Sequence, residues 1–260
     1  MLYATLTLEI AGELATLTLN RPEKRNAIST QMIEDLLAAL GEAERSSARV
    51  VILTGAGKAF CSGMDLDTLS AIARQSPEQN LADSQRTAKM FRALWSFPKP
   101  LIAAVNGAAI AGGCGIATLC DFTIAVPEAK LGYSEVRIGF IPALVSVFLT
   151  RQIGEKRARD LLLTGRIVDA DEARELGLVT CVVPAEKLMA TARELAASLI
   201  AASPTSLART KKLLCDSAAA ALDADLQRAI RENARIRATP DFQEGLAAFL
   251  EKRKPVWRGE

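Results

Sequence analysis

The stretch PKPLIAAVNGAAIAGGCGIATLCDFTIA, residues 98–125, decides the fold class of this chain. After the two prolines, the short apolar run 101–105 predicts a buried strand. Four glycines interrupt the segment between 107 and 115, and the last of them lie in an apolar helical run. Another strand is predicted over 122–126. Strands that recur between helices are typical of an α/β fold.

The sequence on the N-terminal side continues this alternation. Residues 5–10 and 14–19 alternate apolar and polar side chains, which predicts a hairpin of half-buried strands. Ser29 precedes apolar residues at helical spacing and is therefore an N-cap candidate. A buried strand is predicted over 50–53, and the polar stretch 67–96 is helix-prone.

The C-terminal part is mostly helical from Ala143 onward, with one strand-like piece at 179–183. Its tail, 205–252, carries a wide apolar stripe of Leu207, Leu213, Leu214, Leu222, Leu226 and Ile230. Such a stripe predicts a helical appendage that lies on the core or on a neighbouring subunit. We therefore divide the chain into a core, 1–203, and a helical C-terminal oligomerisation segment, 204–260.

Composition excludes several kinds of chemistry. The 260 residues include no histidine, so a Ser-His or Cys-His pair, a His base and a His-ligated metal are all impossible. With 32 Lys and Arg against 30 Asp and Glu, the charge shows too little asymmetry for nucleic acid as the main partner. We expect neither a metal nor a nucleic-acid partner, and any anionic ligand should be small.

Composition also indicates a compartment. Five cysteines without a CxxC spacing favour reduced thiols and a cytoplasmic location. The N-terminal residues lack the basic start and continuous apolar core of a signal peptide. No apolar run reaches the roughly 20 residues that cross a membrane, so we expect a soluble cytoplasmic protein without a membrane partner.

Two glycine-containing turns are the candidates for chemistry, because TGAGKAF (54–60) fails both the phosphate-loop and the dinucleotide patterns. Gly63 allows a tight turn that leaves the amide of Met64 free, and Gly112 opens a helical run with an unpaired donor. Two such amides converging on one carbonyl oxygen would form an oxyanion hole. The alternative interpretation is that both are only tight turns.

Five segments together resemble the crotonase family, also called the enoyl-CoA hydratase and isomerase family, in order and spacing over nearly the whole chain. These segments are LNRPEKRNAIS (19–29), AFCSGMDL (59–66), residues 98–125, SEVRIGFIP (134–142) and AAFLEKRKPVW (247–257). The resemblance implies a spiral of strand-strand-helix turns with a helical C-terminal segment, assembled as a homotrimer or homohexamer. The ligand would be an acyl-CoA thioester, with coenzyme A as part of the substrate and no separate cofactor.

The resemblance also implies roles for individual residues. The amides of Met64 and Gly112 would hold the thioester oxygen, Lys24 and Arg25 would contact the CoA diphosphate, and Lys252 would reach the nucleotide of a neighbouring subunit. Without the resemblance, these lysines and this arginine are ordinary solvated charges. Further substrate-binding candidates are Asn26, Ala27, Ala59, Phe60, Ser62, Leu66 and Phe249, together with Asp65, whose family position is mostly structural.

One departure from the family pattern concerns the catalytic acids. Family hydratases commonly have two glutamates, but this chain has Gly115 at the first position, where it would enlarge the cavity, and Glu135 at the second. Two carboxylates can hold and polarise a water, whereas one suffices to move a proton between carbons. Chemistry alone therefore favours double-bond isomerisation.

Hydration nevertheless remains the leading prediction. GGCG together with SEVRIGFIPALVSVFL resembles a bacterial branch described as hydratases of branched substrates of the methylglutaconyl-CoA kind, which also has glycine at the first position. Isomerisation, another enolate reaction and a non-catalytic acyl-CoA binding protein stay open as alternatives, although retention of Glu135 argues against the last.

Overall fold

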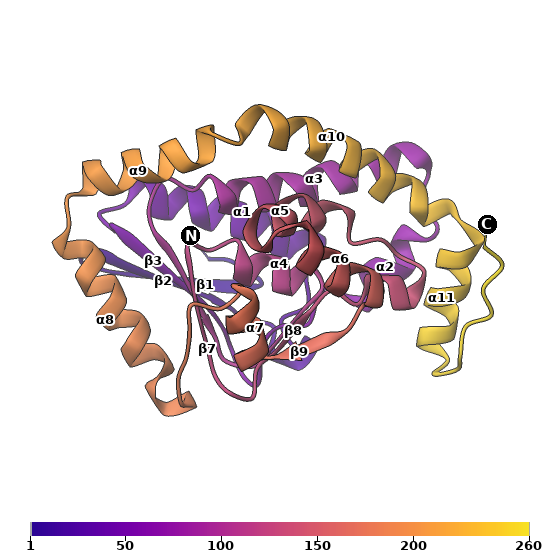
Figure 1. Cartoon of the computed structure of the whole chain (residues 1–260), viewed down its shortest axis with the longest axis horizontal. Coiled ribbons are helices and arrows are strands. Elements are labelled where there is room, and N and C mark those ends of the chain that lie inside the picture. Colours follow the sequence, from indigo (N-terminus) through magenta and orange to yellow (C-terminus); the bar gives the residue numbers. More distant parts are fainter. Residues whose placement is uncertain (1, 260) are drawn as a thin grey trace.

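The computed structural model describes residues 2–259, which form two β-sheets surrounded by helices (Figure 1). The larger sheet has the strand order β1-β2-β3-β5-β7-β10. Its strands are β1 (Leu6–Ala11), β2 (Leu14–Leu19), β3 (Val50–Gly55), β5 (Leu101–Val105), β7 (Phe122–Ala125) and β10 (Cys181–Val182). The smaller sheet consists of β4 (Ala59–Cys61), β6 (Ala108–Ile110), β8 (Lys130–Gly132) and β9 (Ile167–Asp169), in that order. The pairs β1–β2 and β8–β9 are antiparallel, and the other pairs are parallel.

The chain forms a spiral in which each central turn gives one strand to each sheet and then a helix. Strands β3 and β4 are followed by α2 (Leu66–Ile72) and α3 (Pro77–Trp95), and β5 and β6 by α4 (Gly112–Thr118). Strands β7 and β8 are followed by the 3-10 helix η2 (Glu135–Ile138) and by α5 (Ala143–Ile153). This arrangement confirms the α/β fold with strand-strand-helix turns.

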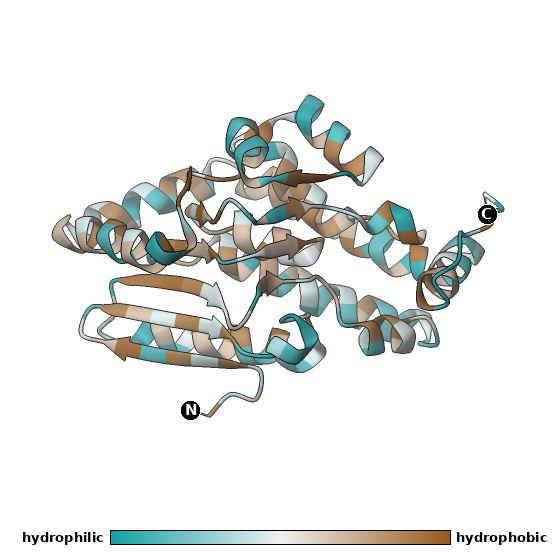
Figure 2. Cartoon of the chain, turned by 90° about the horizontal axis from the view of Figure 1, so that it is seen from below, coloured by the Kyte–Doolittle hydropathy of each residue, from teal (hydrophilic) through white to brown (hydrophobic). Residues whose placement is uncertain are grey.

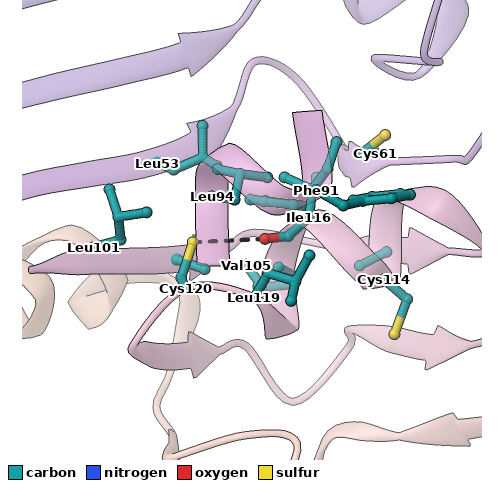
Figure 3. Close-up of a cluster of buried hydrophobic side chains, with 14 of the residues drawn as sticks. Leu53, Cys61, Phe91, Leu94, Leu101, Val105, Cys114, Ile116, Leu119 and Cys120 are labelled. Atoms are coloured by element: carbon teal, nitrogen blue, oxygen red, sulfur yellow. Dashed lines mark hydrogen bonds between the residues drawn. The ribbon is translucent and has the colours of Figure 1, made fainter. Parts of the chain in front are cut away.

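The central strands are buried because helices pack against the larger sheet. Helix α8 (Leu188–Ala201) contacts β3, β5 and β7, and α4 contacts β5. Every residue of β5 is buried, as its continuous apolar sequence requires. Figure 3 shows the core at this level, where Phe91 and Leu94 of α3 lie beside Ile116 and Val105. Figure 2 shows that most strands carry mainly apolar residues, whereas the helices carry both apolar and polar ones.

The N-terminal elements agree with the pattern of the sequence. Ser29 caps α1 (Thr30–Arg45), since its side-chain oxygen accepts a hydrogen bond from the amide of Met32 at 3.2 Å. The shorter elements are η1 (Pro22–Lys24), α6 (Glu155–Thr164), α7 (Ala170–Leu176) and η3 (Ala185–Lys187). The local pattern did not predict the strands of the smaller sheet, because segments of three residues are too short to show a period.

The C-terminal segment crosses the core and ends beside η2. It contains α9 (Pro204–Asp216), α10 (Ala219–Arg235), η4 (Ile236–Ala238) and α11 (Pro240–Leu250), seen along the top and right of Figure 1. The apolar stripe divides between two helices. Leu222, Leu226 and Ile230 are buried where α10 packs on α3 and α5, whereas Leu213 and Leu214 of α9 are 71% and 69% exposed. The expectation that the appendage lies on the core is confirmed for α10.

The cysteines are free, and three of them lie in the core. Burial raises the pKa of the Cys61, Cys114 and Cys120 thiols to about 12, so these side chains remain protonated apolar groups near neutral pH. Between residues 2 and 259, no helix combines the length and the apolar character needed to cross a lipid bilayer.

Candidate active site

A cavity of about 170 Å³ lies between α2, α3, η2, α5 and the last turn of α11. Its wall is mostly apolar. Six of the residues singled out from the sequence line it: Ser62, Met64, Leu66, Gly112, Glu135 and Phe249. The structure therefore brings both predicted oxyanion amides and the predicted carboxylate to one cavity.

The two glycine turns touch each other. Gly63 has a φ of +89°, and a Cβ built on it would lie 3.0 Å from the Ile110 oxygen and 3.2 Å from the Ala111 Cβ. Because the turns are this close, the amides that come after them, those of Met64 and Gly112, are neighbours at the cavity. Neither amide has an acceptor among residues 2–259. Two free donors at one wall are what an oxyanion hole requires.

The local backbone explains how the Gly112 turn is held. Ala111, the N-cap of α4, has φ +52° and ψ −125°, a region that L-residues rarely adopt. Such strain persists only where the surroundings fix it. Gly113 supplies that constraint, because its α-carbon packs so closely on β4 that a Cβ would meet the Cys61 oxygen at 2.2 Å. The start of α4 is thus pressed against the smaller sheet.

The carboxyl group of Glu135 lies at the start of η2, and the residue is only 9% exposed. Its Oε2 atom is buried and has no hydrogen-bond partner in the described chain. Burial disfavours the charged form and raises the pKa of Glu135 to about 7. The group can therefore exist in both its acid and its base form near neutral pH, as proton transfer requires.

Gly115 does not line the cavity. A Cβ at this position would lie 2.7 Å from Val145 Cγ1 and 3.1 Å from Phe91 Cε1. The space of a longer side chain is therefore already occupied by apolar groups of α5 and α3. Glu135 is the one carboxylate in the described lining of the cavity.

The loop after β2 is shaped by Asn26, which is fully buried. Its Nδ2 donates to the carbonyl oxygens of Ala56 and Ala59 at 2.9 and 2.8 Å, and its φ is +56°. Ile28, further along this loop, donates its amide to the Gly63 oxygen at 2.7 Å. Asn26 thus supports the loop that holds the first turn, and it does not line the cavity.

Other predicted contacts lie away from the cavity lining. Ala27, Ala59 and Phe60 are buried. Lys24 is exposed and pairs with Asp67 at 3.1 Å, and Arg25 is exposed with φ +50°. Their proposed contacts with CoA stay predictions.

Asp65 is buried and caps α2, accepting from the Asp67 amide at 3.0 Å. It also forms an ion pair with Arg21 at 2.7 Å, and Arg21 donates to the Ala27 oxygen. Arg21, which joins the loop after β2 to α2, was not among the residues singled out from the sequence. Asp65 therefore has the structural role that its family position implied.

The C-terminal helix contributes to the cavity of its own chain. Phe249, which is 51% exposed, lines the cavity from α11. Lys252 lies just beyond this helix with φ +55° and is exposed, and it does not line the cavity. Its contact with a neighbouring subunit stays a prediction.

Sequence reasoning missed polar residues that reach the cavity from helices. Asn233 of α10, Thr87 of α3 and Ser134 before η2 all line it. A signal for Asn233 was available, since it is a polar residue within an otherwise apolar helical stripe. Between residues 2 and 259, no three Cys, Asp or Glu side chains gather as metal ligands would.

The sequence and the fold both match known proteins. The sequence model of the enoyl-CoA hydratase/isomerase family matches residues 9–260. A Thermus thermophilus protein described as a candidate enoyl-CoA hydratase is 46% identical over 94% of this chain and 97% of its own length. The short-chain-enoyl-CoA hydratase of Clostridium acetobutylicum is 35% identical over 95% of each chain.

Among solved structures, an enoyl-CoA hydratase/isomerase from Xanthobacter autotrophicus Py2 superimposes with a TM-score of 0.89. It is 31% identical and covers 97% of this chain and 98% of its own. Since the family match extends over nearly the whole sequence, the chain belongs to the enoyl-CoA hydratase/isomerase family of enzymes.

Proposed function

We propose that this enzyme catalyses the reversible hydration of a 2-enoyl-CoA, with Glu135 as the proton-transfer group. The observation that carries the proposal is the buried, unpartnered Oε2 of Glu135 in the same cavity as the free amides of Met64 and Gly112. The names of the relatives support hydration as the leading reaction.

The site residues have complementary roles in this reaction. As the water oxygen bonds to C3, the Glu135 carboxylate accepts the water proton, and the alkene electrons move toward the thioester oxygen. The Met64 and Gly112 amides donate to that oxygen and stabilise the enolate. The carboxylic acid then returns a proton to C2, which regenerates the carboxylate. A pKa of about 7 suits both halves of this exchange.

Isomerisation of a 3-enoyl-CoA to a 2-enoyl-CoA is the second candidate. It is favoured by one observation, that Val145 and Phe91 fill the space where a second carboxylate would extend from position 115. In this reaction Glu135 takes a proton from C2 and delivers one to C4, and no water is needed. Both reactions pass through an enolate held by the same amides.

We also propose the contacts with CoA, the cellular compartment and the assembly of the enzyme. The substrate would be an acyl-CoA, its diphosphate would contact Lys24 and Arg25, and the protein would act in the cytoplasm as a homotrimer or homohexamer. Lys252 would then approach the ligand of an adjacent chain.

The test compares crotonyl-CoA with a 3-enoyl-CoA in the parent and in Glu135→Gln. We expect the variant to bind the substrate and to lose at least about a hundredfold in turnover, the usual scale for general acid-base catalysis. Hydration of crotonyl-CoA by the parent would support the leading reaction, and conversion of only the 3-enoyl-CoA would support the second. Near-normal turnover by Glu135→Gln would contradict the role of this carboxylate.

A further inference from the structure

One side-chain amide, that of Asn233, lines the mostly apolar cavity. Asn233 is 5% exposed and lines the cavity from α10, although the C-terminal segment was expected to serve mainly in assembly. An amide at an apolar wall is stable only where its donors and acceptors find partners. Its partners therefore indicate what it can bind.

The orientation of Asn233 is fixed by a buried ion pair. Arg237 Nη2 donates to Asn233 Oδ1 at 2.8 Å, and Arg237 Nη1 pairs with Asp83 Oδ2 at 2.8 Å. The Arg237 and Asp83 side chains are only 1% and 4% exposed. Because a guanidinium has only donors, it must face the amide oxygen, and Nδ2 must point the other way. Nδ2 has no acceptor among the described residues, so it is a free donor of a cavity-lining side chain.

Positions along helix α3 indicate how far this donor lies from the turn at Gly112, whose amide would hold the thioester oxygen. Phe91 belongs to the part of α3 next to this turn, since a Cβ on Gly112 would lie 3.7 Å from Phe91 Cζ. Asp83, which holds Arg237, is two turns earlier on α3, at about 12 Å along a helix that rises about 1.5 Å per residue. Thr87 lies between them and also lines the cavity. Ser84 Oγ donates to the Ile230 oxygen at 3.0 Å, so the part of α10 that carries Asn233 lies beside this early part of α3. We therefore expect Asn233 to face the acyl chain several carbon atoms beyond the thioester.

The charges around the cavity limit which chemical groups of a substrate can accept a hydrogen bond from Asn233 Nδ2. No Lys or Arg lines the described cavity, and the charge of Arg237 is already balanced by Asp83. A carboxylate at the far end of the acyl group, as in substrates of the methylglutaconyl-CoA kind, would be buried there without a counter-charge, which is strongly unfavourable. A hydroxyl or ketone oxygen can accept the hydrogen bond without this penalty.

We propose that Asn233 is a specificity-determining residue that donates a hydrogen bond from Nδ2 to an uncharged oxygen on the acyl chain, several carbons beyond the thioester. Arg237 and Asp83 are positioning residues that hold the amide in this orientation. The inference deepens the proposed function, on which it rests, by assigning the substrate to the hydroxy- or oxo-acyl-CoA class. A hydrocarbon chain would cover this donor without giving it an acceptor.

Binding of saturated thioesters tests the inference apart from turnover, because these compounds cannot be hydrated. Calorimetric titration with 5-hydroxyhexanoyl-CoA, hexanoyl-CoA and adipoyl-CoA compares a hydroxyl, a hydrocarbon and a carboxylate on chains of matched length. We expect the parent to bind the hydroxyacyl thioester about three- to tenfold more tightly than hexanoyl-CoA, the usual range for one neutral hydrogen bond. Adipoyl-CoA should bind most weakly.

Two variants of Asn233 and one control isolate the donor. Asn233→Leu removes both the oxygen that faces Arg237 and the donor, and it should abolish the preference for 5-hydroxyhexanoyl-CoA. Asn233→Asp keeps an oxygen for Arg237 but replaces the donor with an acceptor, so it should abolish the corresponding preference for 5-oxohexanoyl-CoA, whose ketone oxygen can only accept. Asn80→Asp makes the same change at a residue that also contacts Arg237, at 3.3 Å, but does not line the cavity. This control should keep the preference, which a merely structural role of Asn233 does not predict.

Several outcomes would overturn the inference. These are equal affinity of the parent for hydroxyacyl and plain thioesters, tightest binding of adipoyl-CoA, or equal loss of preference in Asn80→Asp. Hydration of crotonyl-CoA without any such preference would overturn the inference alone. Absence of binding by every thioester would overturn the proposed function as well.

Discussion

The buried carboxyl of Glu135 should make the protein less stable as pH rises, because the folded state holds this proton more tightly than the unfolded chain does. Its pKa rises from an ordinary value of 4.5 to about 7 through burial. Below pH 4.5 the group is protonated in both states, and its neutral form is stable in the folded protein. Between pH 4.5 and 7 only the unfolded chain ionises, so stability falls; above pH 7 both states are ionised and the loss is complete.

The size of the effect is set by the pKa difference. A shift from 4.5 to about 7 corresponds to about 3 kcal/mol, at about 1.4 kcal/mol for each pKa unit. The glutamine side chain in Glu135→Gln is uncharged at all of these pH values, so the variant should not show this decrease in stability with rising pH. The amide also has its own burial cost, but that cost does not change with pH.

Urea unfolding at several pH values between 4.5 and 8.5 measures the effect. The free energy of unfolding of Glu135→Gln relative to the parent should increase by about 3 kcal/mol across this range. Glu186→Gln is the matched control, because Glu186 also lies in a 3-10 helix, η3, but is exposed. Parallel pH profiles of the parent and Glu135→Gln would refute the argument that Glu135 is buried and protonated.

Three further predictions concern the neighbouring features. Gly112→Pro removes the amide that we propose as an oxyanion donor, and it should lower turnover by about a hundredfold or more, measured alongside circular dichroism and CoA binding; unchanged turnover in a folded variant would exclude this amide. Gly115→Ala should destabilise the protein by about 1 kcal/mol, because overpacking against Val145 exceeds the gain in helix propensity. Urea unfolding should show no such loss when Gly115→Ala is made in a protein that already carries Val145→Ala. Lys252→Ala should weaken CoA binding in titrations at low salt and less so at high salt, with light scattering unchanged; a salt-independent loss would argue against a charge contact.

The sequence predicted those elements whose local signals agree with the final packing. Ser29 starts a helix because its side-chain oxygen satisfies the Met32 amide, and residues 101–105 form a central strand because every residue is apolar. The turn at Gly63 was found because its φ of +89° favours glycine, and the turn at Gly112 because the next residue, Gly113, packs against the backbone of Cys61. The second sheet was expected only from the resemblance to a family, since its strands are too short to show periodicity.

The rest of the site depends on contacts between distant segments, which local patterns do not contain. The orientation of Asn233 in the cavity depends on Arg237, which pairs with Asp83, 154 residues earlier in the chain. The space beside Gly115 is filled by Val145 and Phe91, which come from two other helices. Neither fact can be inferred from spacing along the chain, and the effect of Gly115 on the size of the cavity stays a prediction.

The ion pair between Asp83 and Arg237 has a consequence for synthesis on the ribosome. Asp83 is translated 154 residues before Arg237, and α10, which packs on α3, also follows much later in the chain. Until α10 and Arg237 have emerged, the face of α3 that α10 covers lacks its partner. A nascent chain that stalls before Arg237 would display this unfinished apolar wall to chaperones and proteases, so premature termination should lead to degradation rather than to a shortened, active enzyme.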